Sequence, residues 1–81
     1  MSKFKYCLTE EGRRRCLKNE FYLQGTPIYK GYTEKIFQLL HKTKKPLSIR
    51  EISELTGINL RSVNGVIMFN VYAGYIKRVQ M

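Results

Sequence analysis

The sequence predicts a mostly helical α+β fold, in which several short helices pack with one small β-sheet. Apolar and polar residues alternate over Lys3–Leu8, which predicts a half-buried strand near the start of the chain. Apolar residues at helical spacing, interrupted by Gly57 and Gly74, predict helices over most of the remainder. The 81 residues, 43% of them hydrophobic, suffice for a modest core, so residues 1–81 are expected to form a single domain.

Residues 1–25 are expected to form this strand and a helix after it. Thr9 follows the strand directly and is a suitable N-cap, and two glutamates come next in the first helical turn. The basic residues stand later in the same helix, so both kinds of charge suit the helix dipole. Leu17 and Phe21, four residues apart, predict an apolar seam. Gly25–Pro27 predicts the break that follows.

The next helix is expected to begin near Thr33, after a linker that runs to Gly31. It should end in the cationic stretch His41–Lys45, because bases suit a helix C-terminus and Pro46 cannot continue the helix. Leu47 is then expected in a very short strand. The apolar face of the helix consists of Ile36, Phe37, Leu39 and Leu40.

The segment after Leu47 predicts two helices joined by a tight turn. Ser48 and Glu51 fit a capping box at the start of the first helix. Gly57 stands at the turn, Asn59 is an N-cap for the second helix, and a glycine at position 74 should end it. Such an arrangement is the scaffold that carries one helix into a DNA groove. The expected inward positions are Ile49, Ile52 and Leu55, then Val63, Val66 or Ile67, and Val71.

These features resemble the winged-helix branch of helix-turn-helix domains. The resemblance covers about residues 33–79 and depends on the order of cap, glycine turn and glycine stop. The Ala73–Ile76 ending is similar to the place where the recognition helix of the family gives way to its wing. The resemblance implies three helices packed with a small sheet, with the second helix of the pair facing DNA. The matching residues are Ile49, Ile52, Leu55, Gly57, Ile58, Val63, Ile67 and Ala73–Ile76.

The order of the wing strands departs from the family pattern. Family members usually continue with strand, wing loop, strand and then LTEEG with a further helix, whereas here KYCLTEEGRRR stands at the N-terminus. We therefore expect Lys3–Leu8 to pair with Tyr75–Val79, which would make a permuted winged helix. The same pairing between two chains would make a strand-exchanged homodimer. An unrelated edge strand over residues 3–8 is the third arrangement.

The resemblance also implies which residues of the second helix face a DNA groove. Arg61 is expected to bond guanine, Asn64 to bond adenine, and Ser62 to bond a phosphate or a base edge. Apolar and small residues stand at the remaining positions, which are Leu60, Gly65, Met68 and Phe69. Met68 and Phe69 are expected to pack against the N-terminal helix through its Leu17 and Phe21 seam, or to form a protein-binding surface.

Asn70 stands where the family commonly has a core leucine. Burying an unpaired amide costs about 1–3 kcal/mol, so a partner is required if the position is buried. Asn70 is therefore expected to bond a nearby backbone group, or else the helix is rotated relative to the family.

The net charge of +9, from fifteen Lys and Arg against six acids, favours a polyanionic partner, although it also promotes solubility. The cations cluster in the N-terminal helix, in the loop before Pro46 and on the predicted wing strands. Cations on a wing suit phosphate contacts, which position a protein without reading bases. The residues expected to contact phosphate are Lys3, Lys5, Arg13, Arg14, Lys44, Lys45, Asn59, Lys77 and Arg78.

The sequence lacks the common catalytic motifs. It has no Gly-rich phosphate loop, no HExxH, no GxSxG and no aspartate, so no enzyme and no cofactor is expected. Cys7, Cys16 and His41 are too few and too dispersed for a zinc site. The cysteines are expected to be small buried hydrophobes, or a disulfide in a hyperthermophile. No apolar run of about eighteen residues or secretion signal is present, so no membrane contact and a cytoplasmic location are expected.

The sequence therefore predicts a protein that binds double-stranded DNA, as a small transcriptional regulator or a nucleoid-type binder. The YCLTEEG pattern is similar to that of archaeal winged helices, and the compact size also suits a virus or mobile element. A winged-helix protein–protein interaction module and an RNA-binding accessory domain are the alternatives. A steep loss of affinity with salt would favour nucleic acid, and a preference for duplex DNA would exclude the RNA alternative.

Overall fold

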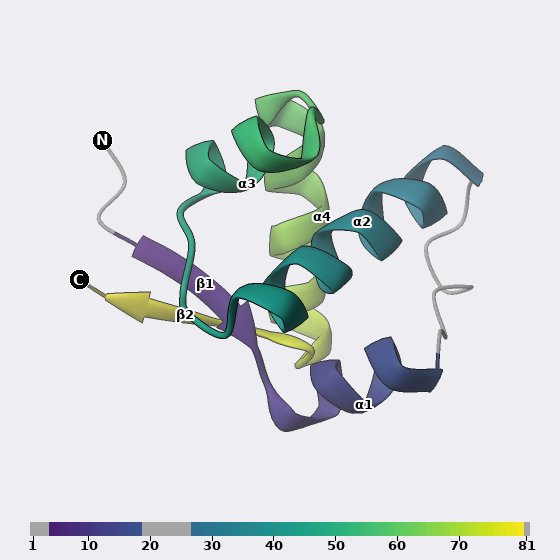
Figure 1. The fold of residues 1–81 in the computed structure, drawn as a ribbon, viewed down its shortest axis with the longest axis vertical. Coiled ribbons are helices and arrows are strands. Elements are labelled where there is room, and N and C mark those ends of the chain that lie inside the picture. Colours follow the sequence, from purple (N-terminus) through teal and green to yellow (C-terminus); the bar gives the residue numbers. More distant parts are fainter. Residues whose placement is uncertain (1–3, 19–26, 81) are drawn as a thin grey trace.

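The computed structural model describes residues 4–18 and 27–80, and their side chains except those of residues 27–30. In these ranges the protein has four helices and one two-stranded antiparallel sheet (Figure 1), so the predicted α+β class is confirmed. In chain order the elements are β1 (Phe4–Leu8), α1 (Glu10–Lys18), α2 (Pro27–Thr43), α3 (Ile49–Thr56), α4 (Leu60–Ala73) and β2 (Ile76–Gln80).

The strands β1 and β2 come from opposite ends of the sequence and pair side by side (Figure 1). Their register places Phe4 opposite Gln80, and the pairing forms within one chain. The predicted pairing of the first strand with the last is therefore confirmed. The other edge of β1 is bridged by Leu47, which exchanges two backbone hydrogen bonds of 2.8 and 2.9 Å with Tyr6. Since β1 has a partner on both sides, the alternative of an unrelated edge strand is wrong.

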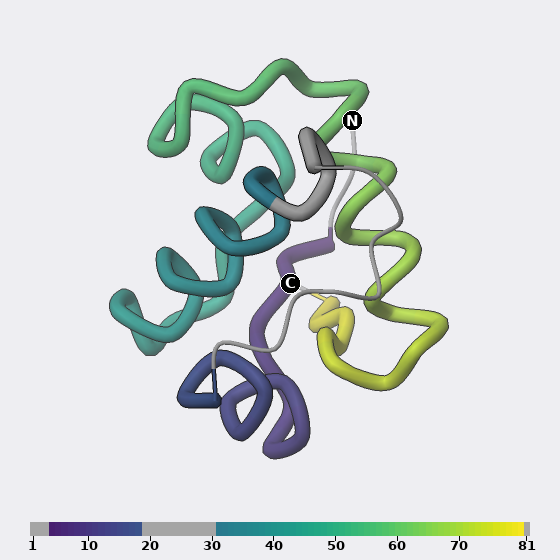
Figure 2. Tube along the Cα trace, turned by 90° about the vertical axis from the view of Figure 1, so that its right-hand side faces the viewer, coloured from purple at the N-terminus to yellow at the C-terminus, as the bar shows by residue number. Residues whose placement is uncertain are grey.

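The core lies between the sheet and the helices α2, α3 and α4. In Figure 2, β1 lies between α2 and α4, and its alternation directs Tyr6 and Leu8 into the core while Lys5 and Cys7 stay half-buried. This burial pattern confirms the half-buried strand. The buried apolar residues are Tyr6, Leu8, Ile36, Phe37, Leu40, Leu47, Ile52, Ile58, Val63, Val66, Ile67 and Ile76.

The helix α2 begins at Pro27, six residues before the predicted start at Thr33. Proline is favoured at the first helical position, because the first turn leaves its N–H groups unpaired in any case and the ring fixes a suitable φ. The predicted linker up to Gly31 is therefore wrong, since a single glycine lowers helix propensity without ending the helix. The C-terminal end agrees with the prediction, and Lys44 follows it with a left-handed φ of 58°.

Two leucines predicted in apolar seams are exposed. Leu55 is 62% exposed, because residues three apart drift by about 60° around a helix and α3 carries Leu55 away from the buried Ile52. Leu17 is 74% exposed, since the face of α1 that is buried centres on Gly12. The predicted packing of Met68 and Phe69 on Leu17 is therefore wrong, and Phe21 lies outside the described residues. Met68 packs against the main core instead.

The predicted caps of the two helices after Pro46 are confirmed. The Ser48 hydroxyl accepts a hydrogen bond from the backbone N–H of Glu51, and the Glu51 carboxylate accepts one from the backbone N–H of Ser48. Gly57 and Gly74 adopt left-handed φ values of 76° and 87°, which favour glycine because it has no Cβ. The Oδ1 of Asn59 accepts the Ser62 N–H at 2.9 Å and caps α4.

Asn70 is buried, with 1% of its surface exposed. Its Nδ2 donates a hydrogen bond of 2.8 Å to the carbonyl oxygen of Val66, one helical turn earlier. The expectation that the amide bonds a nearby backbone group is therefore confirmed. The same residue also holds the end of α4, because its own carbonyl oxygen accepts the N–H of Tyr75 at 2.9 Å.

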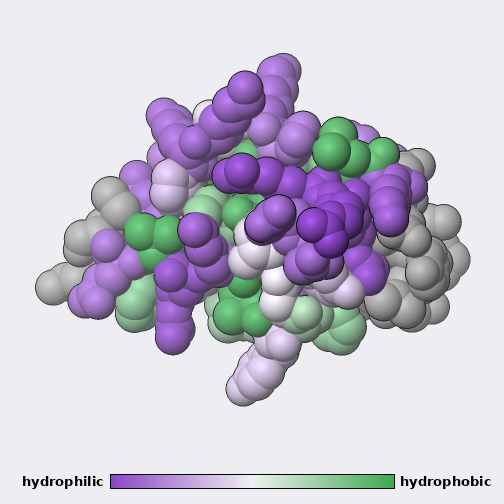
Figure 3. Space-filling model, turned by 90° about the horizontal axis from the view of Figure 1, so that it is seen from below, coloured by the Kyte–Doolittle hydropathy of each residue, from purple (hydrophilic) through white to green (hydrophobic). Residues whose placement is uncertain are grey.

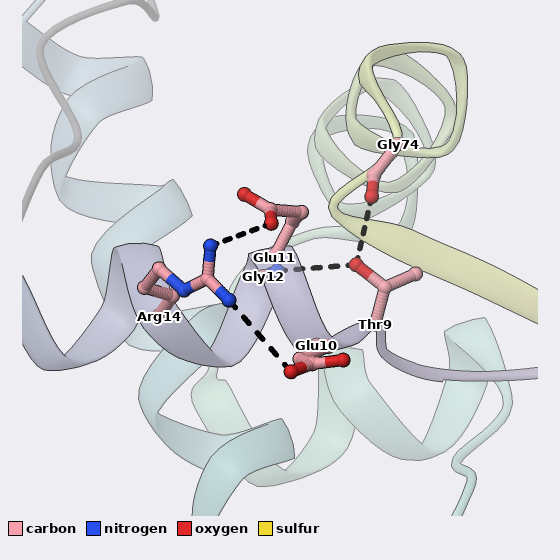
Figure 4. A network of polar contacts seen from close by, with 6 residues as sticks. All are labelled: Thr9, Glu10, Glu11, Gly12, Arg14 and Gly74. Carbon is pink, nitrogen blue, oxygen red and sulfur yellow. Dashed lines mark hydrogen bonds and ion pairs between the residues drawn. The ribbon is translucent and has the colours of Figure 1, made fainter.

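The helix α1 is fixed to the junction between α4 and β2 through Thr9 (Figure 4). The Thr9 hydroxyl accepts the Gly12 N–H at 3.1 Å, which confirms it as the N-cap, and donates to the carbonyl oxygen of Gly74 at 2.7 Å. The backbone N–H of Thr9 also donates to the carbonyl oxygen of Tyr75. The Tyr75 ring lies under the Arg15 guanidinium, 4.0 Å from its centroid. Thr9 therefore joins α1 to the segment between α4 and β2.

Candidate nucleic-acid interface

The exposed face of α4 is set by the residues that the same helix buries. Val63, Val66 and Ile67 are at most 1% exposed and turn one side of the helix into the core. A helix advances about 100° per residue, so positions 61, 64, 65, 68 and 72 are left on the opposite side. Position 68 is half-buried at the edge of this surface, and the other four are exposed.

Two of the three predicted base-facing residues share this exposed face. Arg61 and Asn64 are three residues apart and both exposed, so their side chains are neighbours on the helix surface. Ser62 is half-buried and stands about 100° around the helix from Arg61. The structure therefore brings Arg61 and Asn64 together and leaves Ser62 at the side. The side-chain oxygen of Asn59 is engaged as the N-cap, so only its amide nitrogen is available for phosphate.

The predicted phosphate residues of the sheet fall on both of its faces. Lys77 lies opposite Cys7 and Arg78 lies opposite Tyr6, and successive side chains in a strand point to opposite sides. Arg78 is on the same face as Tyr6, and its guanidinium stacks over the Phe4 ring, 4.4 Å from the centroid. Lys77 is exposed on the other face. Lys3, also predicted here, lies outside the described residues.

Lys5 forms an ion pair with the α3 carboxylate Glu51, at 3.6 Å between Nζ and Oε1. Both side chains are about a third or more exposed, at 35% and 43%, so solvent screens the attraction. The contact therefore positions the Lys5 ammonium without removing it from water.

The cations of α1 are only partly available. Arg14 forms ion pairs with Glu10 and Glu11 (Figure 4), at 3.7 and 2.8 Å, so its charge is balanced within its own helix. Arg15 stacks on Tyr75 and donates a hydrogen bond to its hydroxyl oxygen. Arg13 is exposed. Of the two α1 residues predicted to contact phosphate, Arg14 is therefore the weaker candidate.

Lys44 and Lys45 are exposed in the turn between α2 and Leu47. This turn leads into the bridge that joins Leu47 to Tyr6 of β1. On the face shown in Figure 3, hydrophilic side chains predominate and the hydrophobic areas are small and separated.

The carboxyl group of Glu51 has a pKa below its ordinary value. The backbone N–H of Ser48 is the main cause, and the Ser48 hydroxyl and the Lys5 ammonium lower the pKa further, against a smaller opposing effect of desolvation. Hydrogen bonds to the ionised form stabilise it, so the capping box is strongest when Glu51 is charged.

The Glu51→Gln variant is expected to lose an acid-sensitive part of the stability. A carboxyl with a lowered folded-state pKa stabilises the fold above its unfolded pKa of about 4.3, and this contribution disappears as the pH falls through the folded pKa. The wild type should therefore exceed the variant in unfolding free energy near neutral pH, and the difference should shrink in acid. Urea unfolding of both proteins at neutral and at acidic pH measures this difference in unfolding free energy. Glu54→Gln on the same helix is the charge-matched control. A difference that does not change with pH would contradict the expectation.

A shallow depression between α4 and β2 was not predicted from the sequence. It is lined by Met68, Val71, Tyr72 and Arg78. Two signals could have indicated it. Tyr72 stands one turn after Met68 on the exposed side of the helix, and Arg78 stands two residues after the buried Ile76 in the strand.

The cysteines are unpaired in the structure, which contradicts the disulfide alternative. Both are half-buried, and burial together with the Glu34 carboxylate raises the pKa of the Cys16 thiol.

Over residues 4–18 and 27–80 no three His, Cys, Asp or Glu side chains are grouped as a metal site would need. In the same ranges no helix has the length and apolar character needed to cross a membrane.

No protein-family model, curated protein or solved structure significantly matches this chain. The geometry of α4, the sheet and the charged side chains around them is therefore the basis for proposing a function.

Proposed function

We propose that this protein binds double-stranded DNA as a winged-helix protein, in the role of a small transcriptional regulator or a nucleoid-type binder. The observation that carries the proposal is the exposed face of α4. It displays Arg61 and Asn64 side by side, and these side chains are suited to hydrogen bonds with guanine and adenine in the major groove. The left-handed turn at Gly57 and the Asn59 cap before α4 fit the helix-turn-helix scaffold.

The pairing of β1 with β2 supports the winged-helix part of the proposal. The two strands meet beside the C-terminal end of α4, where the resemblance implies a wing, and they carry Lys5, Lys77 and Arg78. All six carboxylates of the chain stand before residue 55, so α4 and β2 carry only positive charge. Positive charge on these two elements favours phosphate and raises the rate of association with it.

Fluorescence anisotropy of a labelled duplex of about 20 base pairs, titrated between about 50 and 200 mM salt, tests the proposal. The logarithm of the binding constant should fall with log salt at a slope of about 0.9 for each phosphate contacted. Arg61→Ala should weaken binding about tenfold at a preferred sequence, because a bidentate base contact contributes about 1–3 kcal/mol. Lys35→Ala removes one exposed charge from α2 and is the matched control, with a change of less than about twofold expected.

Absence of binding at the lowest salt would refute the proposal. So would equal losses in the Arg61→Ala and Lys35→Ala variants, since that would make the affinity a property of net charge alone. A duplex RNA of the same length belongs in the same titration. Tighter binding to it would favour the RNA-binding alternative.

A protein–protein interaction module is the second candidate, and one observation favours it. Leu60 and Phe69 are 49% and 50% exposed on α4, at either side of the Arg61–Asn64 face. Exposed apolar side chains on one helix suit a partner that covers them. Binding that does not change with salt would favour this function over nucleic acid.

A further inference from the structure

The depression between α4 and β2 combines apolar side chains with an aromatic ring and a cation. Met68 and Val71 are its half-buried apolar residues, and the exposed Tyr72 and Arg78 complete the lining. Tyr72 is 94% exposed although it belongs to the last turn of a well-packed helix. The ring of this tyrosine therefore offers nearly its whole surface to a ligand.

The position of Arg78 is set by the sheet. Its guanidinium stacks over the Phe4 ring of the neighbouring strand, and this cation–π contact holds the charge next to the depression while the side chain remains exposed. Arg61 is the only cation within α4 and lies on the same exposed face of that helix as Tyr72. Residues 55–81 contain no Asp or Glu, so α4 and β2 themselves contribute no acidic side chain to this surface.

We propose that this depression takes an unpaired DNA nucleobase, stacked on Tyr72, with Arg78 contacting the adjoining phosphate. The protein would then bind a duplex with a single-stranded overhang more tightly than a blunt duplex. The inference adds a substrate preference to the proposed DNA-binding function and depends on it. It differs from groove reading by α4, because it uses the flat face of a base.

The chemistry of the lining favours an unpaired base over a paired one. In a duplex each base is stacked between its neighbours and only its edges are accessible in the grooves. A base in a single strand has a free π-face, and aromatic side chains bind such faces with little regard to sequence. The lining has a phenol, a thioether, a valine and a guanidinium, so its hydrogen-bonding groups are the Tyr72 hydroxyl and the Arg78 guanidinium, and the rest of it can contact only the face of a base.

The full chain is tested by anisotropy with three DNAs: a blunt duplex, the same duplex with an overhang of about six nucleotides, and the overhang strand alone. The overhang should raise affinity about tenfold over the blunt duplex, as expected for stacking of one base. Tyr72→Ala should abolish this overhang-to-blunt ratio, whereas Tyr72→Phe, which keeps the ring, should retain it; the ratio is the measured quantity because Tyr72 shares the exposed face of α4. Circular dichroism checks the fold of both variants.

Each outcome separates this inference from the proposed function. Equal binding of the blunt and overhang duplexes, or a preference that survives Tyr72→Ala, would overturn the stacking proposal and leave duplex binding intact. Binding of the overhang and single strand, lost in Tyr72→Ala, without blunt-duplex binding would support stacking and refute the duplex function. Failure to bind any of the three would refute both.

Discussion

Replacing Gly12 with alanine is expected to lower the free energy of unfolding by about 3 kcal/mol, at the upper end of the usual cost of overpacking. A Cβ at this position would overlap the carbonyl oxygen of Tyr75 and would stand 3.0 Å from its carbonyl carbon. Both are backbone atoms of the residue just before β2, so no flexible side chain can move aside. Either α1 shifts and strains the Thr9 hydrogen bonds, or the β2 end of the sheet moves.

Gly31→Ala is the matched control for this experiment. Gly31 is also inside a helix, and no atom that the structure describes lies within 4 Å of the position that its Cβ would take. The same substitution should therefore be neutral or stabilise the protein by up to about 1 kcal/mol, because alanine loses less backbone entropy than glycine on folding. Chemical denaturation of the two variants gives the comparison. Equal stabilities of the two variants would mean that α1 is not docked closely on the Tyr75 backbone.

The local signals in the sequence predicted the ends of the helices well, because each depends on a few neighbouring residues. Ser48 with Glu51, Asn59, and the glycines at positions 57 and 74 all occupy the predicted capping positions. The start of α2 was predicted wrongly because it depends on packing and not on a few neighbouring residues. Gly31 and Pro27 are ambiguous locally, and the helix that contains them is held in place by the packing of Ile36, Phe37 and Leu40.

Contacts between distant segments were predicted only where a resemblance supplied them. The pairing of β1 with β2 followed from the position of LTEEG, since no local pattern could indicate that two strands so far apart in sequence are neighbours. Nothing in the sequence predicted that Gly12 would meet the Tyr75 backbone, or that Arg78 would stack over Phe4. For the site, the resemblance implied that Arg61 and Asn64 face the same way. The ion pairs of Arg14 with two glutamates were not predicted, because they depend on the folded helix.

Asn70→Asp is expected to destabilise the fold by about 3–5 kcal/mol near neutral pH, because it would leave an uncompensated charge in the core. The change is nearly isosteric, so packing is preserved, and only the charge and the hydrogen-bonding chemistry of the side chain are altered. The Asn70 amide donates to the carbonyl oxygen of Val66, and an ionised carboxylate has no proton to donate there. Two oxygen atoms would face each other at a position that is 1% exposed.

The pH dependence of this variant should identify the cause. Burial raises the folded-state pKa of the new carboxyl above its unfolded value of about 3.9, so the folded state binds the proton more tightly. The destabilisation is then complete above the raised pKa and is relieved as the pH falls towards the unfolded pKa. Asn64→Asp makes the same charge change on the exposed face of the same helix, and it should alter thermal stability little at any pH. Equal stabilities of the two variants at neutral pH would contradict the prediction. They would mean that the hydrogen bond from Asn70 to Val66 does not explain why an amide is tolerated at this buried position.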